Sequence, residues 1–250
     1  MSNVAVVTGA ASGIGGATVR RLIGKGYQVL GVDMSGAQET ENLGWVSGDV
    51  SAASTWQGVG EALRRRDWQP SALVTAAAYL EVGNVLELSD DAWARTIGVN
   101  LMGLVFAVRS VLPAMIERGR GSVVTIGSID SYMAEQGLVS YCSSKGAILQ
   151  FTRALAMDHA RQGIRANCVS PGVTDTPFFR RHLATASDPD MFLRSREQRN
   201  PIGRLLDPDE VASTIVYLVS DEASGVTGAN VVVDGGLTVG FDFRTGTGGD

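Results

Sequence analysis

The sequence predicts an α/β protein whose core is a seven-stranded parallel sheet with helices on both faces. Short apolar runs rich in β-branched residues alternate with longer amphipathic segments along nearly the whole chain, which is typical of such sheets. The 250 residues are 44% hydrophobic and 19% charged, as expected for a globular protein. No linker or internal repeat divides the chain, so we expect residues 1–250 to form a single domain.

Seven strands are expected because seven apolar runs end at turn-forming residues: 3–9, 27–33, 43–50, 71–78, 121–128, 164–172 and 229–236. Five helices are expected between them, over 13–26, over 53–66, from the capping residue Ser89 through at least Leu112, over 140–161, and from Asp207 onward. Asp207 precedes a proline and Glu210, which together predict a capping box. Residues 175–206 do not fit the alternation, and we expect the low-complexity end, 244–250, to be a flexible tail.

The composition argues against several classes of partner. A net charge of −5 and a pI near 5.1 disfavour binding to nucleic acid or to an anionic membrane. No run approaches the roughly 18 apolar residues of a spanning helix, and the first basic residue is Arg20, so we expect no signal peptide. Two cysteines make no disulfide framework, and no His/Cys cluster suggests a metal. We expect a cytoplasmic, metal-free protein that acts on a small molecule.

The segment TGAASGIG, residues 8–15, follows the first predicted strand and opens the first predicted helix. Gly9 allows the tight turn, Gly13 lets the backbone approach a phosphate, and Gly15 permits close packing. The helix N-terminus then presents free N–H groups and a positive dipole to a pyrophosphate. Glycines also make plain turns, but this strand–turn–helix context favours a dinucleotide site and therefore a Rossmann-type, doubly wound sheet.

Asp33 ends the second predicted strand, about 20 residues further on, where a carboxylate accepts hydrogen bonds from the adenosine ribose. The same carboxylate repels a 2′-phosphate, and no basic residue follows it, since Met34 and Ser35 come next. This pattern favours NAD over NADP. Asp49, after the third predicted strand, is a candidate for the adenine amino group, with a plain turn aspartate as the alternative.

Tyr141 and Lys145 lie four residues apart at the start of a predicted helix, so their side chains share one helical face. Ser128 ends the fifth predicted strand just before that helix. Ligands of open α/β sheets bind at the carboxyl ends of the strands. We therefore expect Ser128, Tyr141, Lys145 and the glycine turn to meet at one edge of the sheet.

Five ordered elements resemble the short-chain dehydrogenase/reductase family, and the resemblance runs from the first strand to about Leu237. These elements are TGAASGIG, Asn100 in GVNLMG, Ser128, YCSSK (141–145) and SPGVTDT (170–176). The resemblance implies that Lys145 binds the nicotinamide ribose, and that Asn100 holds a water linking Lys145 to solvent. The expected NAD contacts are Gly9, Ser12, Gly13, Ile14, Gly15, Asp33, Asp49, Val50, Ala76, Ala77, Ala78, Tyr141, Lys145, Pro171, Gly172, Val173, Thr174 and Thr176.

The implied reaction is the NAD-dependent interconversion of a secondary alcohol and a ketone. A free tyrosine has a pKa of ~10, and the Lys145 ammonium together with the positive nicotinamide of NAD⁺ is expected to lower the pKa of Tyr141. Tyr141 is then the general acid/base, and Ser128 holds the substrate oxygen. The alternatives are a polyol or sugar dehydrogenase, dehydratase or epimerase chemistry, and a non-catalytic dinucleotide-sensing protein of the same fold.

One motif departs from the family pattern. The family usually has Asn-Asn-Ala-Gly after the fourth strand, where this chain has Thr75-Ala76-Ala77-Ala78. No side-chain amide remains to tie the neighbouring strands, and Ala78 places a methyl group where glycine lets the cofactor ribose approach. A backbone contact tolerates alanine, so we expect cofactor binding to survive.

Residues 175–206 occupy the place of the family's substrate lid and carry many apolar side chains, which predicts a mainly apolar or alicyclic substrate. Its lining is expected to include Tyr79, Met133, Leu138, Phe178 and Phe179. The alternative is that the lid's apolar residues only pack the lid onto the body. The arginines at 180, 181, 194, 196 and 199 are expected to form a solvated face, with contact to a substrate or partner as the alternative, and His182 is expected to be a surface or helix residue rather than a catalyst.

The resemblance also implies a homotetramer, with the helices after Asp90 and Ser140 at its interfaces. The segment Gly240–Phe243 is expected to pack locally rather than to reach a neighbouring subunit's site.

Overall fold

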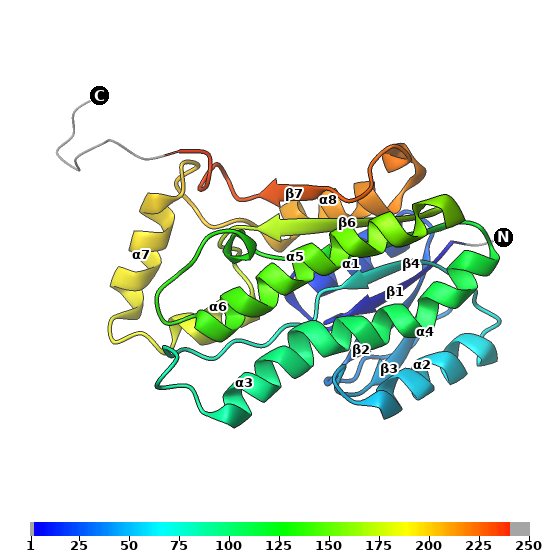
Figure 1. Cartoon of the computed structure of the whole chain (residues 1–250), viewed down its shortest axis with the longest axis horizontal. Coiled ribbons are helices and arrows are strands. Elements are labelled where there is room, and N and C mark those ends of the chain that lie inside the picture. Colours follow the sequence, from blue (N-terminus) through cyan, green and yellow to red (C-terminus); the bar gives the residue numbers. More distant parts are fainter. Residues whose placement is uncertain (1–2, 241–250) are drawn as a thin grey trace.

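Seven parallel strands form one sheet in the order β3-β2-β1-β4-β5-β6-β7, which confirms the predicted fold class (Figure 1). The computed structural model describes residues 3–240, so the tail at 244–250 and most of Gly240–Phe243 lie outside the described residues. The strands are β1 (Val4–Thr8), β2 (Gln28–Asp33), β3 (Leu43–Ser47), β4 (Pro70–Thr75), β5 (Gly121–Ile126), β6 (Ile164–Pro171) and β7 (Asn230–Val233).

Of the helices that accompany these strands, α1, α2, α5 and α8 match the predicted positions closely, whereas α6 and α7 were not predicted. They are α1 (Gly13–Gly24), α2 (Ala53–Arg65), α3 (Asp90–Ile97), α4 (Gly103–Glu117), α5 (Val139–His159), α6 (Pro177–Leu183), α7 (Pro189–Arg199) and α8 (Pro208–Val219). The predicted caps are present: Ser89 accepts a hydrogen bond from Ala92 N, and Asp207 and Glu210 form a capping box.

Two apolar layers cover the two faces of the sheet. On one face the strands pack against α2, α4 and α5 through residues such as Trp56, Val108 and Ile148. On the other face they pack against α1 and α8 through residues such as Leu22 and Ile215. Figure 1 shows α2, α4 and α5 in front of the sheet and α1 and α8 behind it. Because β1, β4 and β5 are covered on both sides, their residues are almost entirely buried.

The single helix expected after Ser89 is interrupted by a π-helical turn, Gly98–Met102, between α3 and α4. The whole run Asp90–Glu117 is long and apolar enough to cross a membrane by length and composition, with a mean hydropathy of 1.8 in its most apolar window. The expectation that no such stretch exists was therefore wrong. In this fold, 44% of that window is buried, and a core helix of a globular protein passes the same test.

The lid segment 175–206 is mostly helical, because α6 and α7 occupy it. Both helices begin with a proline and have a side-chain cap, from Thr176 and Asp188 respectively. Phe179, Leu183 and Leu205 form a small cluster of their own, against which Phe192 packs. These apolar side chains therefore pack mainly against one another within the lid, whereas the alternative reading had expected them to pack the lid onto the body. Figure 1 shows α6 and α7, in yellow, beyond the arrowheads of the strands.

Candidate active site

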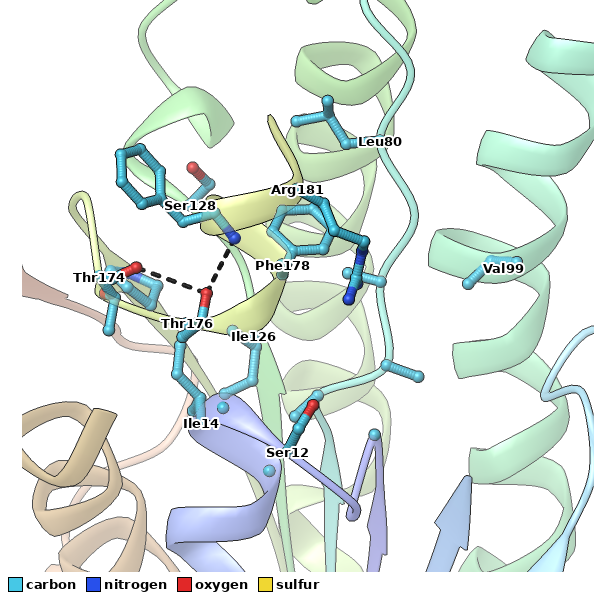
Figure 2. A pocket seen from close by; sticks show the side chains of 18 of the residues that line it. Ser12, Ile14, Leu80, Val99, Ile126, Ser128, Thr174, Thr176, Phe178 and Arg181 are labelled. Carbon is cyan, nitrogen blue, oxygen red and sulfur yellow. Dashed lines mark hydrogen bonds between the residues drawn. The ribbon is translucent and has the colours of Figure 1, made fainter. Parts of the chain in front are cut away.

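A cavity of about 660 Å³ lies at the carboxyl ends of the strands, beneath the lid. Every residue that the sequence predicts to contact the cofactor lines this cavity, as do Ser128, Tyr141 and Lys145. Figure 2 looks into it: Ser12 and Ile14 lie at the start of α1, and Thr176 and Phe178 face them from the lid. The strand order reverses direction between β1 and β4, the position where open α/β sheets bind ligands.

The glycine turn leaves room for a phosphate-bearing ligand. Gly9 and Gly13 have positive φ angles of 65° and 53°. A Cβ at Gly9 would meet the backbone of Ala76 and Ala77 at 2.7–2.9 Å, and a Cβ at Gly15 would overlap the carbonyl oxygen of Gly9. Side chains are therefore excluded by sterics at Gly9 and Gly15.

The N-terminus of α1 has N–H groups free for an anion. Within residues 3–240, the Ser12 side chain makes no capping hydrogen bond, and the first turn of α1 carries no acidic residue. The first N–H groups of a helix have no partner inside the helix, and here no side chain supplies one. A dinucleotide pyrophosphate fits this arrangement, because it brings the oxygens that these N–H groups lack.

Asp33 is held at the end of β2 by two backbone donors. Ala11 N donates to its Oδ2 at 3.1 Å, and Ser35 N donates to its Oδ1 at 3.0 Å. Each carboxylate oxygen keeps a further lone pair for a ligand hydroxyl. In the described part of the chain, the cations that line the cavity are Lys145, Arg181 and Arg196, all from helices at its other end.

Asp49 stabilises the turn before α2 and also lines the cavity. Its Oδ1 accepts from Ser51 N at 2.8 Å and from Ser51 Oγ at 2.7 Å, which sets the turn before α2. The turn role, considered as the alternative, is therefore present. Because the carboxylate also faces the cavity, contact with the adenine amino group stays a prediction.

The end of β4 is tied to β1 by a hydrogen bond that the sequence did not reveal. Ala77 N donates to Thr8 Oγ1 at 3.1 Å. The Thr8 hydroxyl, which is 2% exposed, thus supplies a tie between neighbouring strands where the family's side-chain amides are missing. Ala78 lines the cavity, so the consequence of its methyl group for cofactor affinity stays a prediction.

Thr176 closes the cavity over the glycine turn. Its Oγ1 accepts from Phe179 N at 3.1 Å and donates to Thr174 O at 3.4 Å, as the dashed lines in Figure 2 show. Its Cγ2 would lie 3.2 Å from a Cβ on Gly13. The lid therefore begins in direct contact with the turn that would hold the phosphates.

Tyr141 and Lys145 lie together in the first turns of α5, with the Lys145 Nζ 5.4 Å from the centroid of the Tyr141 ring. Nζ also donates to Ile126 O at 2.7 Å. Burial lowers the pKa of Lys145 to about 8, so it is an ammonium at neutral pH. Burial also raises the pKa of Tyr141, and Asp130 raises it further, while the Ser128 hydroxyl opposes the rise. The predicted lowering of the Tyr141 pKa by Lys145 together with the nicotinamide of bound NAD⁺ stays a prediction.

Ser128 is bound to a carboxylate in the same short turn. Its Oγ donates to Asp130 Oδ2 at 3.2 Å and accepts from Asp130 N at 3.1 Å. Burial raises the pKa of Asp130, and the nearby Glu135 raises it further. Asp130 also lines the cavity, so a second polar group lies beside the serine that the sequence singled out.

Asn100 is 3% exposed and lies in the π-helical turn rather than on the cavity wall. Its Nδ2 donates to Tyr79 O and to Ser144 Oγ, both at 2.9 Å, and its Oδ1 accepts from Tyr79 N at 2.7 Å. These bonds fix the chain after β4 against α5, next to Lys145. A water relay through Asn100 stays a prediction.

Charged side chains line the part of the cavity under the lid, which sequence reasoning missed. Arg196, from α7, pairs with Glu135, and the two side chains are only 16% and 28% exposed. Arg181 and His182, from α6, line the cavity too, and Figure 2 shows Arg181 beside Phe178. The expectation of a solvated face was thus wrong for Arg196, which is half-buried, whereas Arg181 is exposed as expected and also lines the cavity. Arg194 and Arg199 are exposed as expected.

Only some of the residues predicted to line a substrate site lie together in the main cavity. Leu138, Phe178 and Phe179 line the main cavity. Tyr79 lines a second cavity of about 450 Å³, which shares Ala78, Leu80, Phe178, Arg181 and His182 with the first. Met133 is 50% exposed and lines neither, because its loop carries it outward. In residues 3–240, no group of three or more His, Cys, Asp or Glu residues could hold a metal ion.

Comparison with known proteins gives consistent matches over nearly the whole chain. A family model described as enoyl-(acyl carrier protein) reductase matches residues 9–238. The zebrafish (Danio rerio) dehydrogenase/reductase SDR family member 6 is 32% identical over 238 residues, which are 93% of this chain and 96% of that protein.

Solved structures agree with this result. The ligand-free aldohexose dehydrogenase of Thermoplasma acidophilum superposes with a TM-score of 0.91 at 30% identity, covering 98% of this chain and 97% of that one. A single-residue variant of actinorhodin polyketide ketoreductase, solved with NADPH, superposes with a TM-score of 0.86 at 31% identity, covering 94% and 97%.

Proposed function

The chain belongs to the short-chain dehydrogenase/reductase family, and on that premise we propose that it is an NAD-dependent dehydrogenase that interconverts a secondary alcohol and a ketone. The family uses nicotinamide dinucleotide cofactors and acts on small molecules. One observation carries the proposal: Ser128, Tyr141 and Lys145 line the same cavity as the open glycine turn and Asp33. When bound, NAD⁺ supplies the hydride acceptor for alcohol oxidation, and NADH supplies the donor for ketone reduction.

The residues of the glycine turn and the lid hold the cofactor. The free N–H groups at the start of α1 bind the pyrophosphate, and Asp33 accepts the hydrogen bonds of the adenosine ribose. Lys145 binds the second ribose, and the backbone of Val173 and Thr174 with the Thr176 side chain holds the carboxamide.

Three side chains handle the substrate oxygen and its proton. Ser128 donates a hydrogen bond to the oxygen and orients it. In oxidation Tyr141 takes the hydroxyl proton as the carbon–oxygen double bond forms, and in reduction it returns the proton. Burial raises the pKa of Tyr141, and the positive charges of Lys145, whose Nζ lies 5.4 Å from the Tyr141 ring centroid, and of the nicotinamide of NAD⁺ would favour the phenolate. Asn100 supports a proton relay that connects Tyr141, through Lys145, with solvent.

The preference for NAD over NADP rests on Asp33. Its carboxylate would lie against a 2′-phosphate, and the cavity's lining cations belong to α5, α6 and α7 rather than to the end of β2. The ketoreductase solved with NADPH has the same fold, so the choice of cofactor depends on side chains such as Asp33 and not on the fold. A higher kcat/KM with NADP⁺ than with NAD⁺ would contradict this assignment.

We also propose that the protein is a cytoplasmic homotetramer. The supporting observation is the apolar run Asp90–Glu117, of whose most apolar window only 44% is buried within one chain. A second copy packed on α4 and α5 would cover the remainder. A monomeric mass by light scattering would contradict the tetramer.

The experiment that tests the proposed activity follows NADH absorbance with NAD⁺ and then NADP⁺ at mildly alkaline pH, over a panel of secondary alcohols. Tyr141→Phe should lower kcat by at least about 10²-fold, as expected for loss of general acid–base catalysis, while NAD⁺ binding is spared. Tyr217→Phe is the matched control, because Tyr217 is 43% exposed on α8. Binding of NAD⁺ without turnover of any alcohol would instead indicate a dinucleotide-sensing protein.

A further inference from the structure

We propose that Asp130 is a specificity-determining residue that selects substrates with a second hydroxyl group on the carbon next to the reacting one. The inference rests on the proposed function, because it says which residue binds the substrate hydroxyl next to the oxygen that reacts. It concerns the one carboxylate that, among the described residues, is hydrogen-bonded to the Ser128 hydroxyl.

Asp130 is held rigidly where a substrate would lie. It belongs to a single 3-10 turn, Ile129–Ser131, that follows β5 directly. Ser128 N donates to Ser131 Oγ at 3.1 Å, and Asp130 N donates to Ser128 Oγ at 3.1 Å, so the turn is closed at both ends. The backbone of the turn is therefore fixed, and the bond from Ser128 Oγ holds the Asp130 carboxylate beside the serine on the wall of the cavity that Tyr141 also lines.

The Asp130 carboxylate and the substrate oxygen compete for the single hydrogen of the Ser128 hydroxyl, and a second substrate hydroxyl would remove this competition. The Ser128 hydroxyl has one hydrogen, and it points at Asp130 Oδ2, 3.2 Å away. When Ser128 turns this hydrogen to a substrate oxygen, the partly buried carboxylate loses its donor. An unsatisfied buried acceptor is costly. A neighbouring hydroxyl on the substrate supplies the missing donor.

The geometry suits two hydroxyl groups on adjacent carbons. When gauche, their oxygens lie about as far apart as two hydrogen-bonded oxygens, which is also the separation of Ser128 Oγ and Asp130 Oδ2. One substrate oxygen can therefore accept from Ser128 while the other donates to Asp130. Leu138 and Phe178 line the cavity as well and would contact the carbon skeleton, as the predicted apolar wall requires.

The local charge disfavours an acid in the same place. Arg196 is paired with Glu135, and although Arg196 and Lys145 both act to lower the pKa of Asp130, burial and Glu135 outweigh them. A substrate carboxylate on the carbon next to the reacting one would meet the Asp130 carboxylate, and like charges at close range repel. The site thus favours a neutral vicinal diol or sugar over a 2-hydroxy acid.

The test compares kcat/KM with NAD⁺ for matched substrate pairs: meso-2,3-butanediol against 2-butanol, and cis-cyclohexane-1,2-diol against cyclohexanol. We expect the wild type to favour each diol by on the order of 10²-fold, since a site built to bind a hydroxyl rejects the analogue that lacks it. Asp130→Ala should reduce this ratio below about 10, and Asp130→Asn, which keeps an acceptor oxygen, should give an intermediate ratio. Asp158→Asn, an exposed carboxylate on α5, should leave the ratio unchanged.

Each other result separates the inference from the proposed function. If the monohydroxy alcohols react as well as the diols, the dehydrogenase assignment stands and the role of Asp130 is wrong. The same holds if Asp130→Ala lowers kcat/KM for both members of a pair by the same factor, which would make Asp130 only a positioning residue for Ser128. A preference for lactate over every neutral diol would also overturn it and would direct attention to Arg181. If no alcohol reacts while NAD⁺ binds, the proposed function itself fails, and the inference fails with it.

Discussion

The two walls of the cavity are built in different ways. The cofactor wall consists largely of backbone: Gly9 and Gly15 lie so close to neighbouring main chain that an added Cβ would collide with it. The lid wall consists of long side chains from α6 and α7, held by the Arg196–Glu135 pair and a small apolar cluster. The first wall tolerates almost no change, whereas the second can change its chemistry while the sheet stays intact.

This difference has an energetic basis. Overlap with a main-chain atom cannot be relieved without moving a strand, and the strands are packed on both faces. An ion pair near the surface contributes only about 0–1 kcal/mol, more when it is partly buried. Variants on the two walls should therefore differ in how much stability they lose and in whether they weaken cofactor or substrate binding. Four variants test this difference.

The largest effect is expected for Gly15→Ala. Its Cβ would overlap the Gly9 carbonyl, so the turn must open and both stability and NAD⁺ binding should be lost. Gly24→Ala is the matched control in the same helix, because nothing lies within 4 Å of a Cβ there, and it should raise stability by up to about 1 kcal/mol. Chemical denaturation and calorimetric NAD⁺ titration measure both. A Gly15→Ala protein that binds NAD⁺ normally would show that the cofactor wall is not sterically closed.

The next effect concerns Lys145, whose folded pKa of about 8 lies below its ordinary value of 10.5. The charged form is disfavoured in the folded protein, so a stability penalty is fully present below pH 8 and disappears as the pH rises to 10.5. The stability of the wild type relative to Lys145→Met should therefore increase by about 3 kcal/mol over that range. Denaturation at a series of pH values measures the difference, and parallel curves would contradict the burial of the ammonium.

A smaller effect is expected for Thr8→Val, on the cofactor wall. It removes the hydroxyl that accepts the Ala77 N–H, which leaves a half-buried donor without a partner and should cost about 1 kcal/mol of stability. Thr8→Ser keeps the hydroxyl and serves as the control, with a loss below about 1 kcal/mol. NAD⁺ affinity should fall with Thr8→Val if this bond stands in for the family's strand-tying amides. Equal stabilities of the two variants would show that the bond is dispensable.

The smallest effect on stability is expected on the lid wall, for Arg196→Met. Loss of the partly buried pair with Glu135 should cost about 1 kcal/mol and raise the substrate KM severalfold, with NAD⁺ affinity unchanged. Arg180→Met is the control, because it breaks an exposed lid pair with Asp175 and should change neither constant. Steady-state kinetics measure the substrate KM, and NAD⁺ titration measures the cofactor affinity. A weaker NAD⁺ affinity in Arg196→Met would show that the lid wall also contributes to cofactor binding.

The sequence alone determined the sheet, the main helices that cover it and the cofactor wall. Local spacing was sufficient there: glycines at a strand–helix junction, Asp33 at a strand end, and Tyr141 and Lys145 one helical turn apart. In a parallel sheet, all strand ends with such residues meet at one edge, so order along the chain predicts neighbours in space. Each of these side chains lines the cavity in the structure.

Only the tertiary structure decided the lid wall and the ties behind the site. Arg196 and Glu135 are 61 residues apart, and Asn100 reaches Tyr79 through a π-helical turn that no sequence period signals. Asp130 lies two residues from Ser128, yet its direction depends on a short turn that aims the carboxylate back at the serine. Such contacts depend on how helices and loops that are distant in the sequence pack against one another. Glycine turns and the residues that share a helical face, in contrast, follow from local backbone geometry.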